Sequence, residues 1–125
     1  MSLQPVPIQN VPGVPDYTCT AFLPKSSDYC LLIPVINEGS RILTELGRAQ
    51  KAGVDRLVDI VICDGGSTDG SMNPDTLELY GVNTLLVKTG PGKQGAQLRM
   101  GLHFALTFGY KGVLTIDGNN KDSIE

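Results

Sequence analysis

The chain has 125 residues, enough for one small domain and too few for two domains of ordinary size. Hydrophobic residues make up 41% and charged residues 18%, a balance typical of a folded globular protein. The net charge is −3 and the sequence has no basic stripe, so we expect no nucleic-acid partner. No apolar run reaches the ~20 residues of a membrane-spanning helix, so we expect no span in this chain.

The three cysteines, Cys19, Cys30 and Cys63, have no spacing that suggests a metal clip, and their number is odd. Cys30 and Cys63 lie in apolar runs, and we expect both to be small core residues. No basic segment followed by an apolar one opens the chain, so the sequence predicts no secretory signal. These features favour a reducing, cytoplasmic location.

Residues 1–28 contain five of the eight prolines and show no apolar periodicity. Proline removes backbone donors and blocks helices, so this segment is predicted to be an extended arm. Residues 29–125 are predicted to form the folded domain. Apolar runs typical of strands buried on both faces occur there at residues 29–34, 57–63, 83–88 and 113–117.

Three helices are predicted between these strands. Ser40 can cap the first, which runs to about residue 52, and Asn73 followed by Pro74 suits the start of a short second one. The third covers residues 95–108. Its spacing puts four apolar residues on one side, namely Leu98, Leu102, Ala105 and Leu106.

The regular alternation of strand and helix predicts parallel pairing and a doubly wound α/β sheet. Ligands of such sheets bind at the carboxyl ends of the strands. Every predicted strand ends in polar or glycine-rich sequence: NE at 37–38, DGGSTDG at 64–70, GPGKQG at 90–95 and DGNN at 117–120. We therefore expect one binding site along this edge.

Two aspartates belong to the second of these segments. Asp64 ends a strand, where its carboxylate could accept hydrogen bonds from a base or a ribose or could cap the following loop. We favour ligand contact for Asp64. For Asp69 we favour a structural role in the turn formed by residues 67–70.

Residues 90–95 match the pattern G-x-G-x-x-G, follow a strand and open a helix, with Asp117 roughly 20 residues further on, as in a dinucleotide-binding fingerprint. The glycines would let backbone N–H groups approach a phosphate. Two features count against a dinucleotide: the motif belongs to the third strand instead of the first, and Pro91 has no backbone donor. Lys93 is either a phosphate partner or a solvated loop charge.

Residues 117–122 are rich in oxygen ligands. Asp117 and Asn119 could hold Mg²⁺ or Mn²⁺ together with a substrate diphosphate, or the segment could be a plain turn. His103 is the single histidine and lies within a predicted helix, so we expect a structural role for it.

Together, the four segments resemble the donor-binding region of family 2 glycosyltransferases, which have the GT-A fold. The similar segments are LIPVINE at 32–38, IVICDGGSTDGS at 60–71, GKQGAQLRMG at 92–101 and VLTIDGN at 113–119. The resemblance covers about residues 29–125, and dolichyl-phosphate mannosyltransferase-like members are the most similar in character.

The resemblance implies a Rossmann-like domain that binds a nucleoside-diphosphate sugar for transfer to an acceptor, which in such members can be lipid-linked. The residues that it assigns to the donor are Pro34, Asn37, Glu38, Asp64, Lys93 and Asp117, with Asp117 and Asn119 for the metal. The metal would act as a Lewis acid that stabilises the leaving nucleoside diphosphate.

The sequence departs from the family at several points. Gly65 stands where the family has a second acid, Ile36 replaces an aromatic residue, and Asn119 replaces the second acid of the Asp-x-Asp element. Family members also continue well beyond that element, so the chain corresponds to a truncated, N-terminal portion without the catalytic base. The resemblance thus implies donor binding and leaves transfer by this chain open. An unfinished sheet would expose an apolar edge and predicts a homo-oligomer.

Two alternatives remain open at this point. The first is an NAD(P)-binding oxidoreductase domain, which rests on residues 90–95 and Asp117. The second is a non-catalytic binding module derived from the glycosyltransferase fold, which rests on the changed acids at Gly65 and Asn119.

Overall fold

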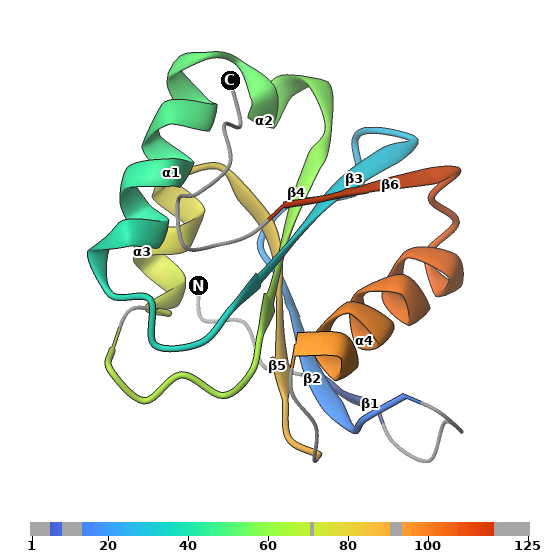
Figure 1. The fold of residues 1–125 in the computed structure, drawn as a ribbon. Helices are drawn as coiled ribbons and strands as arrows, with labels where there is room; N and C mark the ends of the chain where they lie inside the picture. The colour runs from blue at the N-terminus through green and yellow to red at the C-terminus, as the bar shows by residue number, and fades with distance from the viewer. Residues whose placement is uncertain (1–5, 9–13, 71, 91–93, 117–125) are drawn as a thin grey trace.

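The computed structural model describes residues 6–8, 14–70, 72–90 and 94–116. These residues form a six-stranded mixed sheet with helices on both faces (Figure 1). The α/β class predicted from the sequence is confirmed.

The four strands predicted from apolar runs are all present. They are β3 (Tyr29–Val35), β4 (Asp59–Asp64), β5 (Val82–Lys88) and β6 (Gly112–Thr115). All three pairings among them are parallel, in the spatial order β5-β4-β3-β6. The chain moves outward from β3 to β5 and then returns to the other side of β3 to form β6. The connections therefore diverge between β3 and β6, at the type of switch point where open α/β sheets bind ligands.

The helices are α1 (Ser40–Lys51), α2 (Val54–Leu57), α3 (Pro74–Leu79) and α4 (Gln94–Thr107). The first three lie on one side of the sheet and α4 lies on the other (Figure 1). As predicted, Asn73 caps α3: its Oδ1 accepts from the N–H groups of Asp75 and Thr76 at 3.0 and 3.3 Å. Ser40, by contrast, is the first residue of α1, and the capping residue is Gly39, which has no side chain to offer.

Each face of the sheet has its own apolar core. Cys30, Leu32 and Cys63 face α4, whereas the alternate residues Leu31 and Ile33 belong to the core on the side of α1 and α3. Both faces are therefore buried, which accounts for the unbroken apolar runs of the strands. Both cysteines are core residues, as predicted.

The buried side of α4 differs from the apolar side predicted for it. Of the residues predicted for that side, Ala105 is buried, but Leu102 and Leu106 are 42% and 80% exposed. The helix instead buries Met100 and Phe104 against the sheet. Polar Gln97 and small Gly101 occupy further buried positions on that side. Leucine spacing was misleading here because the packed side of the helix is not its most apolar one.

Two short parts of the proline-rich segment belong to the sheet. They are β1 (Val6–Ile8) and β2 (Tyr17–Ala21), and β2 pairs antiparallel with β5. Tyr17 is buried in the core beneath α4. β2 thereby covers an edge of β5 that would otherwise be open. With five residues, β2 is too short and too polar to be recognised from apolar periodicity.

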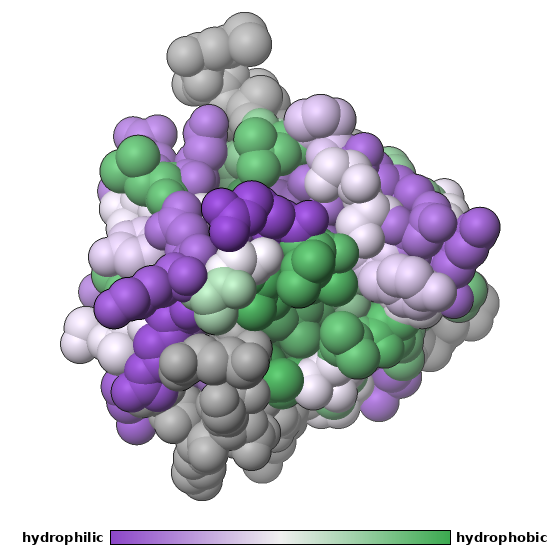
Figure 2. All heavy atoms as spheres, turned by 90° about the horizontal axis from the view of Figure 1, so that it is seen from above, coloured by the Kyte–Doolittle hydropathy of each residue, from purple (hydrophilic) through white to green (hydrophobic). Residues whose placement is uncertain are grey.

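Apolar side chains also reach the surface. Figure 2 shows a group of them on the face that is turned upward in Figure 1. In β6 and α2, Leu114 and Leu57 are 56% and 72% exposed. Across the part of the chain that is described, no helix combines the length and apolar character that crossing a membrane requires.

The contact between α4 and the sheet yields a first prediction. A Cβ atom on Gly101 would lie 2.8 Å from Cys63 Sγ and 3.0 Å from Leu32 Cδ1, closer than packed atoms tolerate. We expect Gly101→Ala to lower the free energy of unfolding by about 1–3 kcal/mol, although alanine favours helices. Urea unfolding measures this.

The matched control is Gly47→Ala in α1, where the new Cβ would lie 3.5 Å from Tyr80 Cε1, an ordinary contact. It is expected to retain stability or to gain about 0.5–1 kcal/mol. Equal stability of the two variants would show that α4 does not need the close approach at Gly101.

Candidate functional site

The loops that follow β3 and β4 bind each other at the carboxyl edge of the sheet. The Asn37 N–H donates to Ser67 Oγ at 2.9 Å, and the Thr68 N–H donates to Asn37 Oδ1 at 2.8 Å. Asn37 has a φ of 46°, a left-handed conformation that asparagine tolerates better than most residues. Two of the segments predicted to form the site are thus brought together.

Asp64 lies under its own loop. It is 2% exposed, and its Oδ1 accepts from Ser67 Oγ at 2.6 Å, the Ser67 N–H at 3.0 Å and the Gly66 N–H at 3.3 Å. The capping role that the sequence left open is therefore realised for this oxygen. Since Ser67 Oγ donates to Asp64 and accepts from Asn37, it connects two of the predicted site residues.

Asp69 contacts the segment that precedes α1. Its Oδ2 accepts from the Gly39 N–H at 3.0 Å, at the residue that precedes α1. A carboxylate at this end of a helix is favourable because the helix dipole is positive there. Asp69 therefore provides the polar partner at the start of α1 that was expected from Ser40.

Glu38 and Pro34 belong to the same region. Glu38 Oε2 lies 3.2 Å from Arg41 Nη2 in the first turn of α1, and the Glu38 side chain is only 14% exposed. Pro34 is buried within β3 opposite Cys63. Among the described residues the pairing of β3 with β6 ends at Leu32, so the missing N–H of Pro34 falls beyond that ladder.

Gln97, which the sequence did not single out, joins α4 to both strand ends. It is 4% exposed, and its Nε2 donates to the carbonyl oxygens of Val35 at 2.8 Å and of Cys63 at 2.9 Å. The same Val35 oxygen accepts from the Gly65 N–H at 2.8 Å. The sequence carried no usable signal of this role, because the leucine spacing of α4 pointed to a different packed side.

Gly65 lies directly beneath the Gln97 side chain. A Cβ atom on Gly65 would be 3.0 Å from Gln97 Cδ and 3.2 Å from both Oε1 and Nε2. The amide therefore occupies space that a side chain on residue 65 would need.

The start of the glycine-rich segment is held by the N-terminal region. The N–H groups of Thr89 and Gly90 both donate to the Asp16 carbonyl oxygen, at 2.8 and 2.9 Å. A Cβ on Gly90 would lie 2.8 Å from the Asp16 nitrogen, so this glycine allows two backbone segments to pack closely. Its N–H is already used within the protein.

The remaining predicted site residues, Lys93, Asp117 and Asn119, lie outside the described residues. The phosphate and metal portions of the predicted site therefore remain predictions. Within the described ranges, no cluster of three or more His, Cys, Asp or Glu side chains could hold a metal ion.

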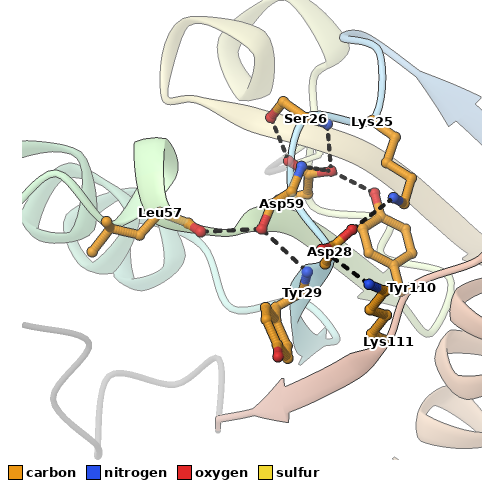
Figure 3. Close-up of polar contacts among 9 residues, drawn as sticks. Lys25, Ser26, Asp28, Tyr29, Leu57, Asp59, Tyr110 and Lys111 are labelled. Carbon is orange, nitrogen blue, oxygen red and sulfur yellow. Dashed lines mark hydrogen bonds and ion pairs between the residues drawn. The ribbon is translucent and has the colours of Figure 1, made fainter.

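A second polar cluster lies at the opposite, amino end of β4 (Figure 3). The buried Asp59 carboxylate accepts from Ser26 Oγ at 2.7 Å, the Ser26 N–H at 3.0 Å and the Tyr110 hydroxyl at 2.6 Å. Burial, followed by the bond to Asp59, raises the pKa of Tyr110 above its usual value. These contacts bind the segment before β3 and the turn before β6 to the sheet, so we interpret the cluster as structural.

His103 also has a structural contact, in agreement with the expectation. Its Nδ1 lies 2.6 Å from the hydroxyl of Tyr17.

Buried groups near this contact have raised pKa values. Burial, with smaller contributions from Cys19 and Cys63, raises the pKa of Tyr17 to about 12. Burial, followed by the nearby Asp59, raises the pKa of Cys30 to about 11. Thiols with raised pKa values form little thiolate at neutral pH, which argues against a reactive cysteine there.

Comparison of the chain with protein-family models, with curated proteins and with solved structures found no match.

The loop contacts predict a specific effect of Ser67→Ala. This variant removes the hydroxyl that bonds to both Asp64 and the Asn37 N–H, and it leaves the buried carboxylate with fewer donors. We expect a loss of about 1–3 kcal/mol of unfolding free energy in denaturant titration. Ser40→Ala, at an exposed position without a side-chain cap, should stay within about 0.5 kcal/mol of the unchanged protein. Equal losses would contradict the assignment of the loop contact to Ser67.

Alkaline pH provides a separate test. Because the folded-state pKa of Tyr17 is about 12 and its ordinary value is 10.0, the unfolded state loses this proton first. The unfolding free energy should therefore fall between pH 10 and 12. The buried thiols also lower the unfolding free energy as the pH rises from ~8.5. The comparison is therefore with Tyr17→Phe, whose unfolding free energy should decline less steeply above pH ~10. The same slope in both proteins would contradict the raised pKa.

Proposed function

We propose that this chain is the donor-binding domain of a family 2-like glycosyltransferase with a GT-A, Rossmann-like fold. Its ligand would be a nucleoside-diphosphate sugar at the carboxyl edge of β3, β4 and β6. Support comes from the parallel strand order β5-β4-β3-β6, in which the connections diverge between β3 and β6 as they would in a doubly wound sheet.

The observation that carries the proposal is the contact between the loops that follow β3 and β4. Residues 36–39 and 65–70 come from separate strand ends, yet Asn37 and Gly39 bond directly to Ser67, Thr68 and Asp69. The start of α4 joins the same place through Gln97. A rigid edge of this kind suits a ligand that must be held in one orientation.

The NAD(P)-binding alternative has weaker support. In a dinucleotide fingerprint, the backbone N–H groups of the glycine-rich turn face the pyrophosphate. Here the Gly90 N–H donates to the Asp16 carbonyl, and Pro91 has no N–H. Two of the donors that the motif would offer are therefore missing.

The non-catalytic binding module is favoured by a different observation. The described polar groups at the edge form bonds within the protein: Asn37 to Thr68, Asp64 to Ser67, and Asp69 to Gly39. A module that retained the loops for assembly or weak nucleotide binding would need no more than this. We keep it as the second candidate.

The remaining parts of the proposal concern residues that the sequence alone supplies. Asp117 and Asn119 would hold Mg²⁺ or Mn²⁺, and Lys93 would lie near the diphosphate. When bound, the metal would supply positive charge that stabilises the leaving nucleoside diphosphate. The same proposal includes transfer of the sugar to an acceptor, which can be lipid-linked. It also includes self-association of the chain and a cytoplasmic location.

A thermal-shift panel tests the proposed function. It compares UDP, GDP, their sugar derivatives and NAD(P), each with and without Mn²⁺. A nucleoside diphosphate at ten times its Kd should add ~1.4 kcal/mol of stability, which corresponds to a rise in Tm of ~3–8 °C. Stabilisation by NAD(P) alone would reverse the order of the candidates. No response to any ligand would favour the non-catalytic module.

A further inference from the structure

Gln97 raises a question that the proposed function leaves unanswered. A buried side-chain amide has two N–H donors, and such groups are retained in a core only where their hydrogen bonds are satisfied. Gln97 Nε2 lies 2.8 Å from the Val35 oxygen and 2.9 Å from the Cys63 oxygen. The two carbonyls lie on the neighbouring strands β3 and β4, where each strand passes into the loop that follows it.

We propose that Gln97 is a positioning residue, which couples the start of α4 to the two loops that follow β3 and β4. This inference rests on the proposed function for its effect on a ligand. Gln97 lies in the first turn of α4, immediately after the glycine-rich segment at residues 90–95. Through its amide, the side of the site expected to meet phosphate is connected to the side expected to meet the nucleoside.

Gln97 also packs closely against Gly65, the first residue of the loop after β4. The Gly65 N–H donates to the Val35 oxygen that Gln97 also binds, and the Gln97 Cδ lies 3.0 Å from where a Cβ on Gly65 would be. A side chain on residue 65 and the bound amide of Gln97 therefore compete for the same space. A side chain on residue 65 would press on the Gln97 amide, which would have to move by a few tenths of an ångström.

Asp64 and Ser67 are linked to Gln97 through Gly65. Gly65 connects Asp64 to Gly66 and Ser67, whose N–H groups bind the Asp64 carboxylate. Ser67 Oγ then accepts from the Asn37 N–H in the other loop. Displacement of the Gln97 amide would loosen the loop at Gly65 first and the contact between the loops second.

The test uses the full chain and compares Gln97→Leu with Phe104→Leu. Phe104 lies on the same buried side of α4, is 4% exposed and packs in the core cluster with Tyr110. Its variant lowers core stability without changing the amide. Hydrogen exchange followed by NMR reports on the Gly65 and Ser67 N–H groups without any ligand, and titration with UDP and GDP in the presence of Mg²⁺ gives Kd.

We expect the Gly65 and Ser67 amides to exchange about tenfold faster in Gln97→Leu than in Phe104→Leu, since hydrogen bonds of ordinary strength are lost. Nucleoside-diphosphate Kd should rise by a similar factor in Gln97→Leu alone. Equal exchange in the two variants would overturn the proposal, as would faster exchange with an unchanged Kd.

Two further arrangements keep the outcomes distinct. If Gln97→Leu does not fold, Gln97→Asn serves the same comparison, because its amide is one methylene shorter and does not reach both carbonyls. If the unchanged chain binds no nucleoside diphosphate, the proposed function fails, while the exchange comparison still decides whether Gln97 orders the loops.

Discussion

The carbonyl oxygen of Val35 is the point on which the carboxyl edge of the sheet depends. It accepts from the Gly65 N–H and from Gln97 Nε2, both at 2.8 Å. Three segments that are distant in sequence, at the end of β3, at the end of β4 and at the start of α4, therefore meet at a single acceptor. Because Val35 and Gln97 are buried, water does not readily replace a lost donor at this oxygen, so these bonds matter more than comparable bonds at the surface.

The rest of the edge is built outward from this junction. Once Gly65 is fixed, the loop of residues 65–70 closes around the Asp64 carboxylate, and Ser67 connects it to Asn37. Asp69 then reaches Gly39 and fixes the start of α1. Polar residues that are read most simply as ligand contacts are thus also the groups that order the loops. A binding edge with internal bonds of this kind loses little conformational freedom when a ligand arrives.

The sequence predicted the strands that are buried on both faces well, because a short, unbroken apolar run bounded by polar residues is typical of such strands. Asn73 was identified as a cap because its partners are adjacent in the chain, and such contacts can be read locally. By contrast, β2, the role of Asp69 at Gly39 and the position of Gln97 depend on partners that lie 30 or more residues away. Leucine spacing failed on α4 because Gln97 and Gly101 hold places on its packed side. Of the residues predicted for the donor and the metal, four fall along one edge: Pro34, Asn37, Glu38 and Asp64. The other three, Lys93, Asp117 and Asn119, lie outside the described residues.

The central claim is that the loops after β3 and β4 form one ordered edge that receives a nucleoside diphosphate. The most direct measurement is an amide NMR titration of the isotopically labelled chain with UDP and GDP in the presence of Mg²⁺. The account predicts that the largest shifts occur at residues 36–39 and 65–70 and in the first turn of α4, while the amides around Asp59 at the opposite edge change little. Shifts centred on the Asp59 cluster, or saturating binding without change in either loop, would contradict it.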